Sequence, residues 1–382
     1  MKLRNAWFVV LLSCATRLVA SDDLRAVHEW GTFTSVAGAD GAAMSWKPLA
    51  GPSDLPCFVH RLDSRNLKAA EWGTVRMETP VLYFYPLKPL TVSIHVDFPN
   101  GRVTEWYPRA SSVQPAISRK GWIEWQAVHV GSVLGPLPEL GEASHYYFAR
   151  QTDASPLRSE RENEKMLFYR GIGDFAVDLN AVVSQDGVSL RNDGADTIPA
   201  AIVFENRGGK IGYSVLRGLR EPAQVRFTDL TGSLDALRNS LEQELTEMGL
   251  YRKEAHAMLQ TWQDSWFEEG LRVFYILPRS KVDALLPISI RPPAGQLARV
   301  FVGRVELLSP AMRNELSAAF AAGDVAVLRK YGRFLTAFQR ELNNGRGEVP
   351  MSQRARQFID DSYRQAIAES QALTTGRACP VP

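Results

Sequence analysis

The sequence has few of the features that assign a chain to a familiar functional class. Of its 382 residues only three are cysteine and six are histidine. The 44 lysines and arginines are nearly balanced by 42 aspartates and glutamates, so the chain lacks the positive excess of nucleic-acid-binding surfaces. After the first 20 residues, no uncharged apolar stretch reaches the roughly 18 residues that a membrane-spanning helix needs. Neither a nucleic-acid partner nor a transmembrane segment in the mature chain is therefore expected.

Sequence signatures of well-known catalytic and cofactor sites are also missing. There is no His-Glu-x-x-His or Cys-x-x-Cys motif for a metal, no Gly-x-Ser-x-Gly around a nucleophile, and no complete glycine-rich frame for a nucleotide. A metal site could be built only from distant segments, for example His28, His60 and Glu78. Scattered histidines more often make ordinary hydrogen bonds, so we expect no metal and no cofactor.

The composition is that of a folded globular protein. Hydrophobic residues make up 45% and charged residues 23% of the chain, whereas disordered chains combine low hydrophobicity with high net charge. At roughly 150 residues per domain, the length suggests two or three compact units.

Residues 1–20 have the three parts of a secretory signal. Lys2 and Arg4 precede a short apolar run, and Ala20 stands just before polar residues. We expect cleavage after Ala20, which would make the mature protein periplasmic or extracellular. A lipid anchor on Cys14 is the less favoured alternative, because the residues before it suit a lipidation site poorly.

This cleavage would leave two cysteines, Cys57 and Cys379. An even pair of cysteines in an oxidising compartment is a candidate disulfide. The bridge would close a loop of more than 300 residues, for which the chain-entropy model gives a stabilisation of about 5 kcal/mol. Two unpaired thiols are the alternative.

Two different periodicities divide the chain near residue 230. Before it, short runs rich in β-branched and aromatic residues alternate with turn sequences, a pattern typical of an antiparallel β-sandwich. After it, apolar residues spaced three or four apart indicate amphipathic helices, with further strands between them. We predict an α+β protein with a signal peptide over 1–20, a β-sandwich-like domain over 21–230, and a mixed α/β domain over 231–382 packed on the first.

Capping residues place several helix ends in the second half. Ser233 precedes one helical pattern, and Ser309, followed by proline, precedes another that stops before Gly323. The spacing predicts a further helix over 324–342 and a last one over 352–370.

The most unusual segment is the run His-Glu-Trp-Gly-Thr-Phe-Thr over residues 28–34, whose Glu-Trp-Gly-Thr core occurs again over residues 71–74. Alternate side chains of an extended strand point to opposite faces. One face would carry His28, Trp30, Thr32 and Thr34, and the other Val27, Glu29 and Phe33. The candidate ligand-binding residues are His28, Trp30, Thr32, Trp72 and Arg76, and the candidate catalytic residues are Glu29, Glu71 and Glu78.

Carboxylates beside indole rings can support acid–base chemistry. In a partly dry cleft the pKa of such a carboxylate rises, so that it can act as a general acid. Indole faces also suit sugar rings, and two carboxylates across a glycosidic bond can hydrolyse it. The simpler explanation is structural, because a strand that points Glu to water and the neighbouring Trp into the core contains the same dipeptide.

Three functions stay open. The first is recognition of an extracytoplasmic ligand, a polysaccharide or other envelope component, by the Trp-, Glu- and His-rich N-terminal segment. The second is a secreted, glycoside-directed hydrolase with Glu29 and either Glu71 or Glu78 as its carboxylates. The third is a structural or assembly protein in which the motif only packs.

A second group of aromatic and charged residues occurs in the helical half. Trp262 and Trp266 lie four residues apart on one face of a predicted helix, where packing in the core is favoured over a ligand platform. Acids such as Glu268 follow them. Arginines such as Arg304 could pair with these acids or bind an anionic ligand, and pairing is favoured.

Four segments spread over the chain carry a family resemblance. They are His28-Glu-Trp-Gly-Thr-Phe-Thr-Ser35, Met77-Glu-Thr-Pro-Val-Leu-Tyr-Phe-Tyr85, Phe204-Glu-Asn-Arg-Gly208 and Arg299-Val-Phe-Val-Gly-Arg304. Together they resemble an uncharacterised family of exported bacterial proteins with the His-Glu-Trp-Gly-Thr-Phe-Thr signature. The resemblance implies export and one architecture over most of the mature chain, and it implies no activity, ligand or fold.

Overall fold

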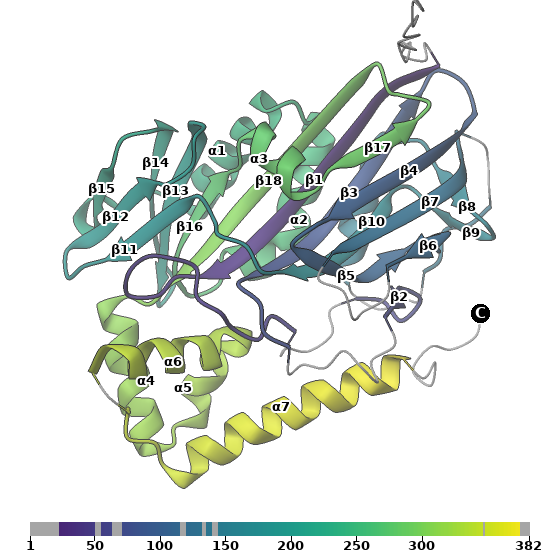
Figure 1. The fold of residues 1–382 in the computed structure, drawn as a ribbon. Helices are drawn as coiled ribbons and strands as arrows, with labels where there is room; N and C mark the ends of the chain where they lie inside the picture. Colours follow the sequence, from purple (N-terminus) through teal and green to yellow (C-terminus); the bar gives the residue numbers. More distant parts are fainter. Residues whose placement is uncertain are drawn as a thin grey trace, which may run out of the picture.

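The computed structural model describes residues 23–49, 55–62, 71–114, 120–131, 135–139, 144–346 and 348–374. These residues form an α+β protein with a nine-stranded, a six-stranded and a three-stranded sheet and several helices (Figure 1). The predicted signal over residues 1–20 and the predicted disulfide partner Cys379 lie outside the described residues.

The nine-stranded sheet is built from both halves of the chain. In spatial order its strands are β14 (Lys210–Leu219), β13 (Ile198–Arg207), β16 (Gly270–Ile276), β18 (Gln296–Leu307), β1 (Leu24–Val36), β3 (Val75–Pro86), β10 (Leu167–Gly173), β5 (Gly101–Tyr107) and β2 (His60–Arg61). The central strand β1 runs parallel to β18 and antiparallel to β3. One sheet therefore contains strands from both sides of residue 230, where we expected a domain boundary.

Strand β1 is covered on both sides. All of its residues except Arg25 are buried, although the strand contains His, Glu, Thr and Ser side chains. Complete burial is typical of a strand in the middle layer of a protein, where neither face meets water. The polar residues of the motif must therefore find partners inside the protein.

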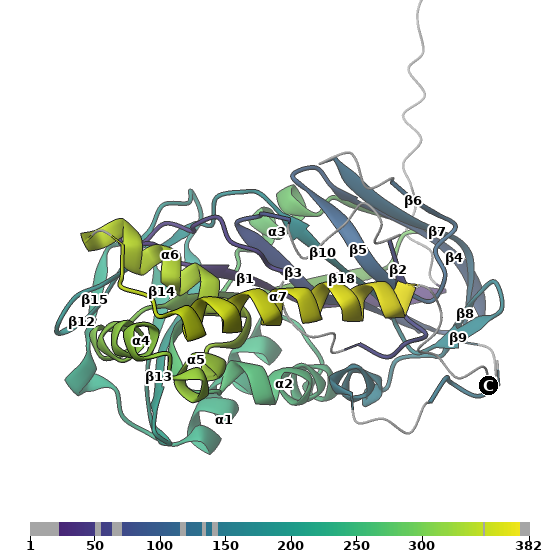
Figure 2. The same cartoon turned by 90° about the horizontal axis from the view of Figure 1, so that it is seen from below.

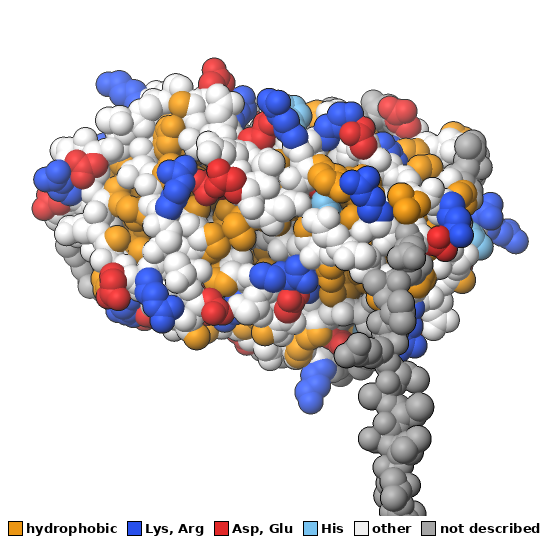
Figure 3. All heavy atoms as spheres, turned by 90° about the horizontal axis from the view of Figure 1, so that it is seen from above, with side chains coloured by type: hydrophobic (Ala, Val, Ile, Leu, Met, Phe, Trp, Pro, Cys, Tyr) orange, Lys and Arg blue, Asp and Glu red, His pale blue; other side chains and the backbone are white. Residues whose placement is uncertain are grey.

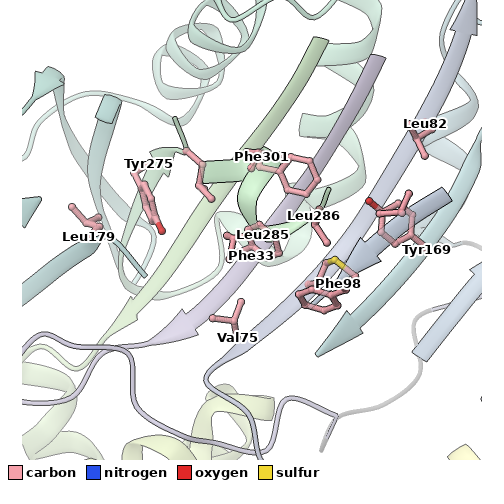
Figure 4. Packing of buried hydrophobic residues seen from close by; sticks show 14 of the residues in the cluster. Phe33, Val75, Leu82, Phe98, Tyr169, Leu179, Tyr275, Leu285, Leu286 and Phe301 are labelled. Atoms are coloured by element: carbon pink, nitrogen blue, oxygen red, sulfur yellow. The ribbon is translucent and has the colours of Figure 1, made fainter. Parts of the chain in front are cut away.

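One face of the large sheet packs against the two smaller sheets. Phe33 and Leu82 of the large sheet join Phe98 and Leu179 of the smaller sheets in one hydrophobic cluster (Figure 4). The six-stranded sheet contains β17 (Ile288–Arg291), β4 (Leu90–Phe98), β7 (Gly121–Val130), β8 (Leu157–Ser159) and β9 (Glu162–Glu164), with β6 (Ser112–Val113) paired to β7. The three-stranded sheet contains β11 (Leu179–Val183), β12 (Gly187–Asn192) and β15 (Ala223–Arg226), and the short helix α3 (Arg279–Leu285) adds to the same cluster.

Two helices cover the opposite face (Figure 2). Helix α1 (Leu234–Glu247) is capped by Ser233, as predicted, and is followed by α2 (Arg252–Trp266). The short 3-10 helix η1 (His145–Arg150) lies beside α2. Trp262 and Trp266 of α2 belong to the same hydrophobic cluster as Trp30 of β1, which confirms the predicted core packing of the two helical tryptophans.

The C-terminal helices form a layer at the end of the sheet where β1 finishes (Figures 1 and 2). They are α4 (Pro310–Ala322), α5 (Val325–Lys330), α6 (Leu335–Arg346) and α7 (Gln353–Thr374). Ser309 caps α4, and Gly323 ends it in the left-handed conformation with a φ of 71°. Both ends agree with the prediction.

The single helix predicted over 324–342 is wrong. It is interrupted after α5, where Gly332 has a φ of 45° and the 3-10 helix η3 (Gly332–Phe334) redirects the chain before α6 begins. Glycine takes this conformation at little cost, so the apolar periodicity continues through a break in the helix. The break places Arg333 next to the large sheet, where it pairs with Glu78 of β3.

The described helices and the surface agree with the composition. Within the described ranges, none of the helices combines the length and the apolar character needed to cross a bilayer. Figure 3 shows Lys and Arg side chains interspersed with Asp and Glu over one face of the molecule. This mixture fits the nearly equal numbers of acidic and basic residues.

Candidate functional site

His28 connects strand β1 to helix α2. Its Nδ1 lies 2.8 Å from Oε2 of Glu254, and both side chains are fully buried. The hydroxyl of Tyr85 and the backbone N–H of Tyr251 donate to the same carboxylate, each at 2.7 Å. The carboxyl group of Glu254 thus joins His28 to two tyrosines and fixes the orientation of the imidazole ring.

Other polar atoms between β1 and α2 are buried without a hydrogen bond. In the described part of the chain, this holds for Nε2 of His28, Oγ1 of Thr32 and the indole nitrogens of Trp262 and Trp266. A buried donor or acceptor of this kind costs about 1–3 kcal/mol, so native proteins contain few.

A bulge in β3 places a buried carboxylate on the same face. Thr79 has a φ of 50°, and the register of β1 with β3 shifts at this point, which brings Thr32 opposite Glu78. The Glu78 side chain is only 1% exposed, and its two oxygens bind the two Nη atoms of Arg333 at 2.8 and 3.1 Å. Arg333 belongs to η3, so this ion pair joins the C-terminal helices to the sheet.

The charge of Glu78 is stabilised by several arginines. Burial alone would raise the pKa of this carboxyl, but the positive charges of Arg333, Arg76 and Arg170 together lower the pKa to about 2. Arg76 is itself buried, and its Nη1 donates to the carbonyl of Pro48 at 2.8 Å. The electrostatic potential at this end of the sheet is therefore positive enough to keep a fully buried carboxylate ionised.

Arg76 and Arg333 line a cavity between the sheet, α2 and η3, which we call the arginine cavity. Its volume is about 290 Å³, close to the lower limit of about 300 Å³ for small-molecule sites. The wall also carries the aromatic rings of Trp262, Tyr331 and Phe334, the hydroxyls of Thr261 and Ser265, the carboxylates of Asp264 and Glu268, and the imidazole of His145.

Ion pairs and ring contacts hold the charged groups around the arginine cavity in place. Nη2 of Arg304 lies 2.8 Å from Oε1 of Glu268, so the predicted pairing of this arginine with an acid of the tryptophan segment is confirmed. The Phe334 ring lies 5.0 Å from the guanidinium of Arg333 and 5.1 Å from that of Arg304. One aromatic ring thereby orients two arginines.

Glu29 points to the other face of β1, away from the arginine cavity. Its carboxylate is fully buried and accepts hydrogen bonds from Nε of Arg299 and from the hydroxyl of Tyr169. Arg299 also binds Asp283 of α3 at 2.8 Å. Glu29 and Glu78 therefore lie on opposite sides of the sheet and share no cleft.

Glu71 is also distant from Glu29. Glu71 pairs with Arg102 at the start of β5, level with the first residues of β3. Glu29 lies opposite Leu82, seven residues beyond Val75 in β3, which is about 23 Å along the strand. The first Glu-Trp-Gly-Thr segment lies in β1, and the second directly precedes the neighbouring strand β3, but their carboxylates do not meet.

The predicted binding residues separate into three environments. Arg76 lines the arginine cavity. Thr32 lies opposite Glu78, the partner of Arg333 in the cavity wall. Trp30 is fully buried, like His28. Trp72 is 43% exposed, and its ring lies 4.4 Å from the guanidinium of Arg340 in α6, outside the lining of the cavity.

Several residues of this region could not be found from the sequence. Arg333 and Tyr331 lie in the stretch that was predicted as uninterrupted helix, so nothing marked them as lining a cavity. Glu254 is separated from His28 by 226 residues. The signal for this region in the sequence is the group of tryptophans and acids around Trp262, whose spacing favours packing in the core.

Neither a metal-binding cluster nor a related protein points to a function. Among the described residues, no three His, Cys, Asp or Glu side chains are grouped so that they could hold a metal ion. A search of protein-family models finds no match to the chain. A search of curated proteins finds no match either.

Proposed function

We propose that this chain is an exported protein that binds a sugar-like extracytoplasmic ligand in the arginine cavity. The observation that carries the proposal is the convergence of aromatic, hydroxyl, carboxylate and guanidinium groups on one opening. Small-molecule sites combine apolar walls with a few well-placed polar groups in this way. Export is the part of the proposal that depends on the signal-like residues 1–20 and on the family resemblance.

The chemistry of the wall suits a pyranose ring. Tyr331, which is partly exposed, offers a flat apolar face on which the C–H groups of a sugar can pack, and the largely buried Trp262 supports the wall. The carboxylates of Asp264 and Glu268 can accept hydrogen bonds from sugar hydroxyls, and Ser265 can donate or accept them. In this proposal the β-sandwich predicted for residues 21–230 corresponds to the packing of the large sheet on the smaller sheets, and this packing serves as a rigid framework.

A glycoside hydrolase with the predicted carboxylates is less well supported. Hydrolysis needs two carboxyl groups about 5–10 Å apart across the bond. Glu29 lies on the opposite face of the sheet, and Glu71 pairs with Arg102. Glu78 is ionised at neutral pH because its pKa is about 2, so it would not serve as a general acid.

A blocking variant tests the proposal. Ser265→Trp places an indole at the wall of the arginine cavity, whereas Asn239→Trp places the same group on the exposed surface of α1. Calorimetric titration with neutral, N-acetylated and acidic monosaccharides should find at least one sugar that binds. Its affinity should fall at least ten-fold in Ser265→Trp and stay unchanged in Asn239→Trp. Absence of binding by every sugar, or equal binding by the two folded variants, would refute the proposal.

A further inference from the structure

A second cavity lies between helix α7 and the segment that runs from α5 through η3 to α6, and we call it the α7 groove. Helix α7 packs on α4 and α5 in the C-terminal layer (Figure 1). The volume of the groove is about 570 Å³, which exceeds that of the arginine cavity and is typical of small-molecule sites.

The inner wall of the α7 groove is apolar. It combines three buried aliphatic side chains with two partly buried ones, namely Leu328, Leu335 and Ala366 with Phe358 and Ile359. Arg329 and Asp360 also line the groove, but both are exposed, so these two charges lie at the surface. Such a wall suits an apolar group, because its burial is favourable, whereas a polar group without a hydrogen bond would lose its hydration.

The α7 groove and the arginine cavity share part of their lining. Gly332 and Arg333 of η3 border both. Gly332 is exposed, and a Cβ atom built on it would meet no atom within 4 Å apart from those of its two chain neighbours. Arg333 is held by its ion pair with Glu78. The surface that joins the two cavities is therefore open at Gly332.

The two cavities differ in chemistry, since one offers hydroxyl, carboxylate and guanidinium groups and the other a buried aliphatic wall. Resting on the function proposed above, we infer that the ligand is an amphiphilic glycoside, a sugar joined to an apolar chain. The sugar occupies the arginine cavity, and the chain crosses Gly332 and lies in the α7 groove. Each buried methylene group increases affinity roughly four-fold, so two are enough for about a ten-fold gain.

Methyl and octyl glycosides of the same sugars test this inference. The β-glycosides of glucose, N-acetylglucosamine and glucuronic acid are titrated below the concentrations at which the octyl compounds form micelles, and chitotetraose is the oligosaccharide probe. The proteins are the parent chain, Ser265→Trp, Ala366→Trp and Ala368→Trp. Ala366 is 7% exposed and lines the α7 groove, whereas Ala368 is exposed on the same helix outside this lining, so Ala368→Trp is the matched control.

We expect at least one octyl glycoside to bind ten-fold or more tightly than its methyl partner. Ala366→Trp should remove most of this gain and leave the affinity for the methyl glycoside within about two-fold of the parent value. Ser265→Trp should weaken both glycosides, and Ala368→Trp should change neither. If Ala366→Trp does not fold, Ser362→Trp replaces it, because Ser362 is exposed and lines the same groove.

The outcomes distinguish the two proposals. Equal affinities for methyl and octyl glycosides would overturn the inference and leave the proposed function intact. The inference would also be overturned by an octyl gain that survives the folded groove variant, or by octyl binding that Ser265→Trp does not weaken. Chitotetraose that binds more tightly than every octyl glycoside, and loses this advantage in the groove variant, would assign the groove to a polysaccharide instead. Failure of every glycoside to bind would refute the proposed function, and the inference with it.

Discussion

Replacing Glu29 by glutamine tests whether the motif carboxylate is a structural group. The substitution keeps the size of the side chain but removes the negative charge that meets Arg299, and both side chains are fully buried. Arg299 would keep only Asp283, a half-exposed acid that Arg279 also binds. Breaking a buried ion pair from one side costs about 3–5 kcal/mol, because the other charge stays desolvated.

Urea unfolding followed by circular dichroism measures this cost. The Glu29→Gln variant should lose about 3–5 kcal/mol of unfolding free energy. The control Asp283→Asn removes the other partner of Arg299 at the surface and should cost at most about 1 kcal/mol. Replacing Glu29 and Arg299 together by methionine removes both charges, so this double variant should be more stable than Glu29→Gln. It would still leave the Tyr169 hydroxyl without its acceptor, at about 1–3 kcal/mol.

Two results would refute this reasoning. One is a Glu29→Gln variant that unfolds within about 0.5 kcal/mol of the parent protein, which is the range of ordinary surface substitutions. The other is an Asp283→Asn variant that loses as much unfolding free energy as Glu29→Gln. A stable Glu29→Gln variant that no longer binds its ligand would instead return Glu29 to the functional residues.

The remaining predictions concern Glu78 and the cysteines. Burial raises the pKa of Glu78, but the nearby arginines lower it by more, so the pKa is about 2 instead of 4.5. The charged form therefore contributes about 3 kcal/mol to the unfolding free energy above pH 4.5. This contribution is lost as the pH falls toward 2, so the decrease in unfolding free energy between about pH 5.5 and pH 3 should be smaller in Glu78→Gln, and an equal decrease would contradict the assignment. Mass spectrometry of the exported protein without reductant should find a peptide that joins Cys57 to Cys379, and two free thiols would exclude this disulfide.

Local sequence patterns predicted many of the elements because their causes are local. Ser233 and Ser309 cap α1 and α4 with hydroxyls that accept from nearby backbone N–H groups, and Gly323 ends α4 in a conformation that favours glycine. The pairing of β1 with β18 joins residues about 270 positions apart, and no capping or periodic signal indicates such a partner. For this reason the strands were predicted, but not the sheet that unites the two halves.

The candidate site shows the same limit. Alternation along β1 predicted that Thr32 and Glu29 face opposite ways, because strand geometry requires it. The bulge at Thr79 sets which residue of β3 stands beside Thr32, and the turn at Gly332 decides that Arg333 reaches Glu78. Both depend on tertiary packing, so the residues that line the cavity could not be predicted from the sequence.

The motif therefore contains two kinds of residue on one strand. On one face, Glu29 binds Arg299 of β18 and Tyr169 of β10, which both belong to the large sheet. On the other face, Thr32 lies opposite Glu78, which pairs with Arg333. A bulge between these positions changes the local direction of the strands, and bulges often accompany functional sites because they re-aim side chains. Substitutions of Glu29 should act through stability, whereas Ser265→Trp in the arginine cavity on the other face of the sheet should act through ligand affinity.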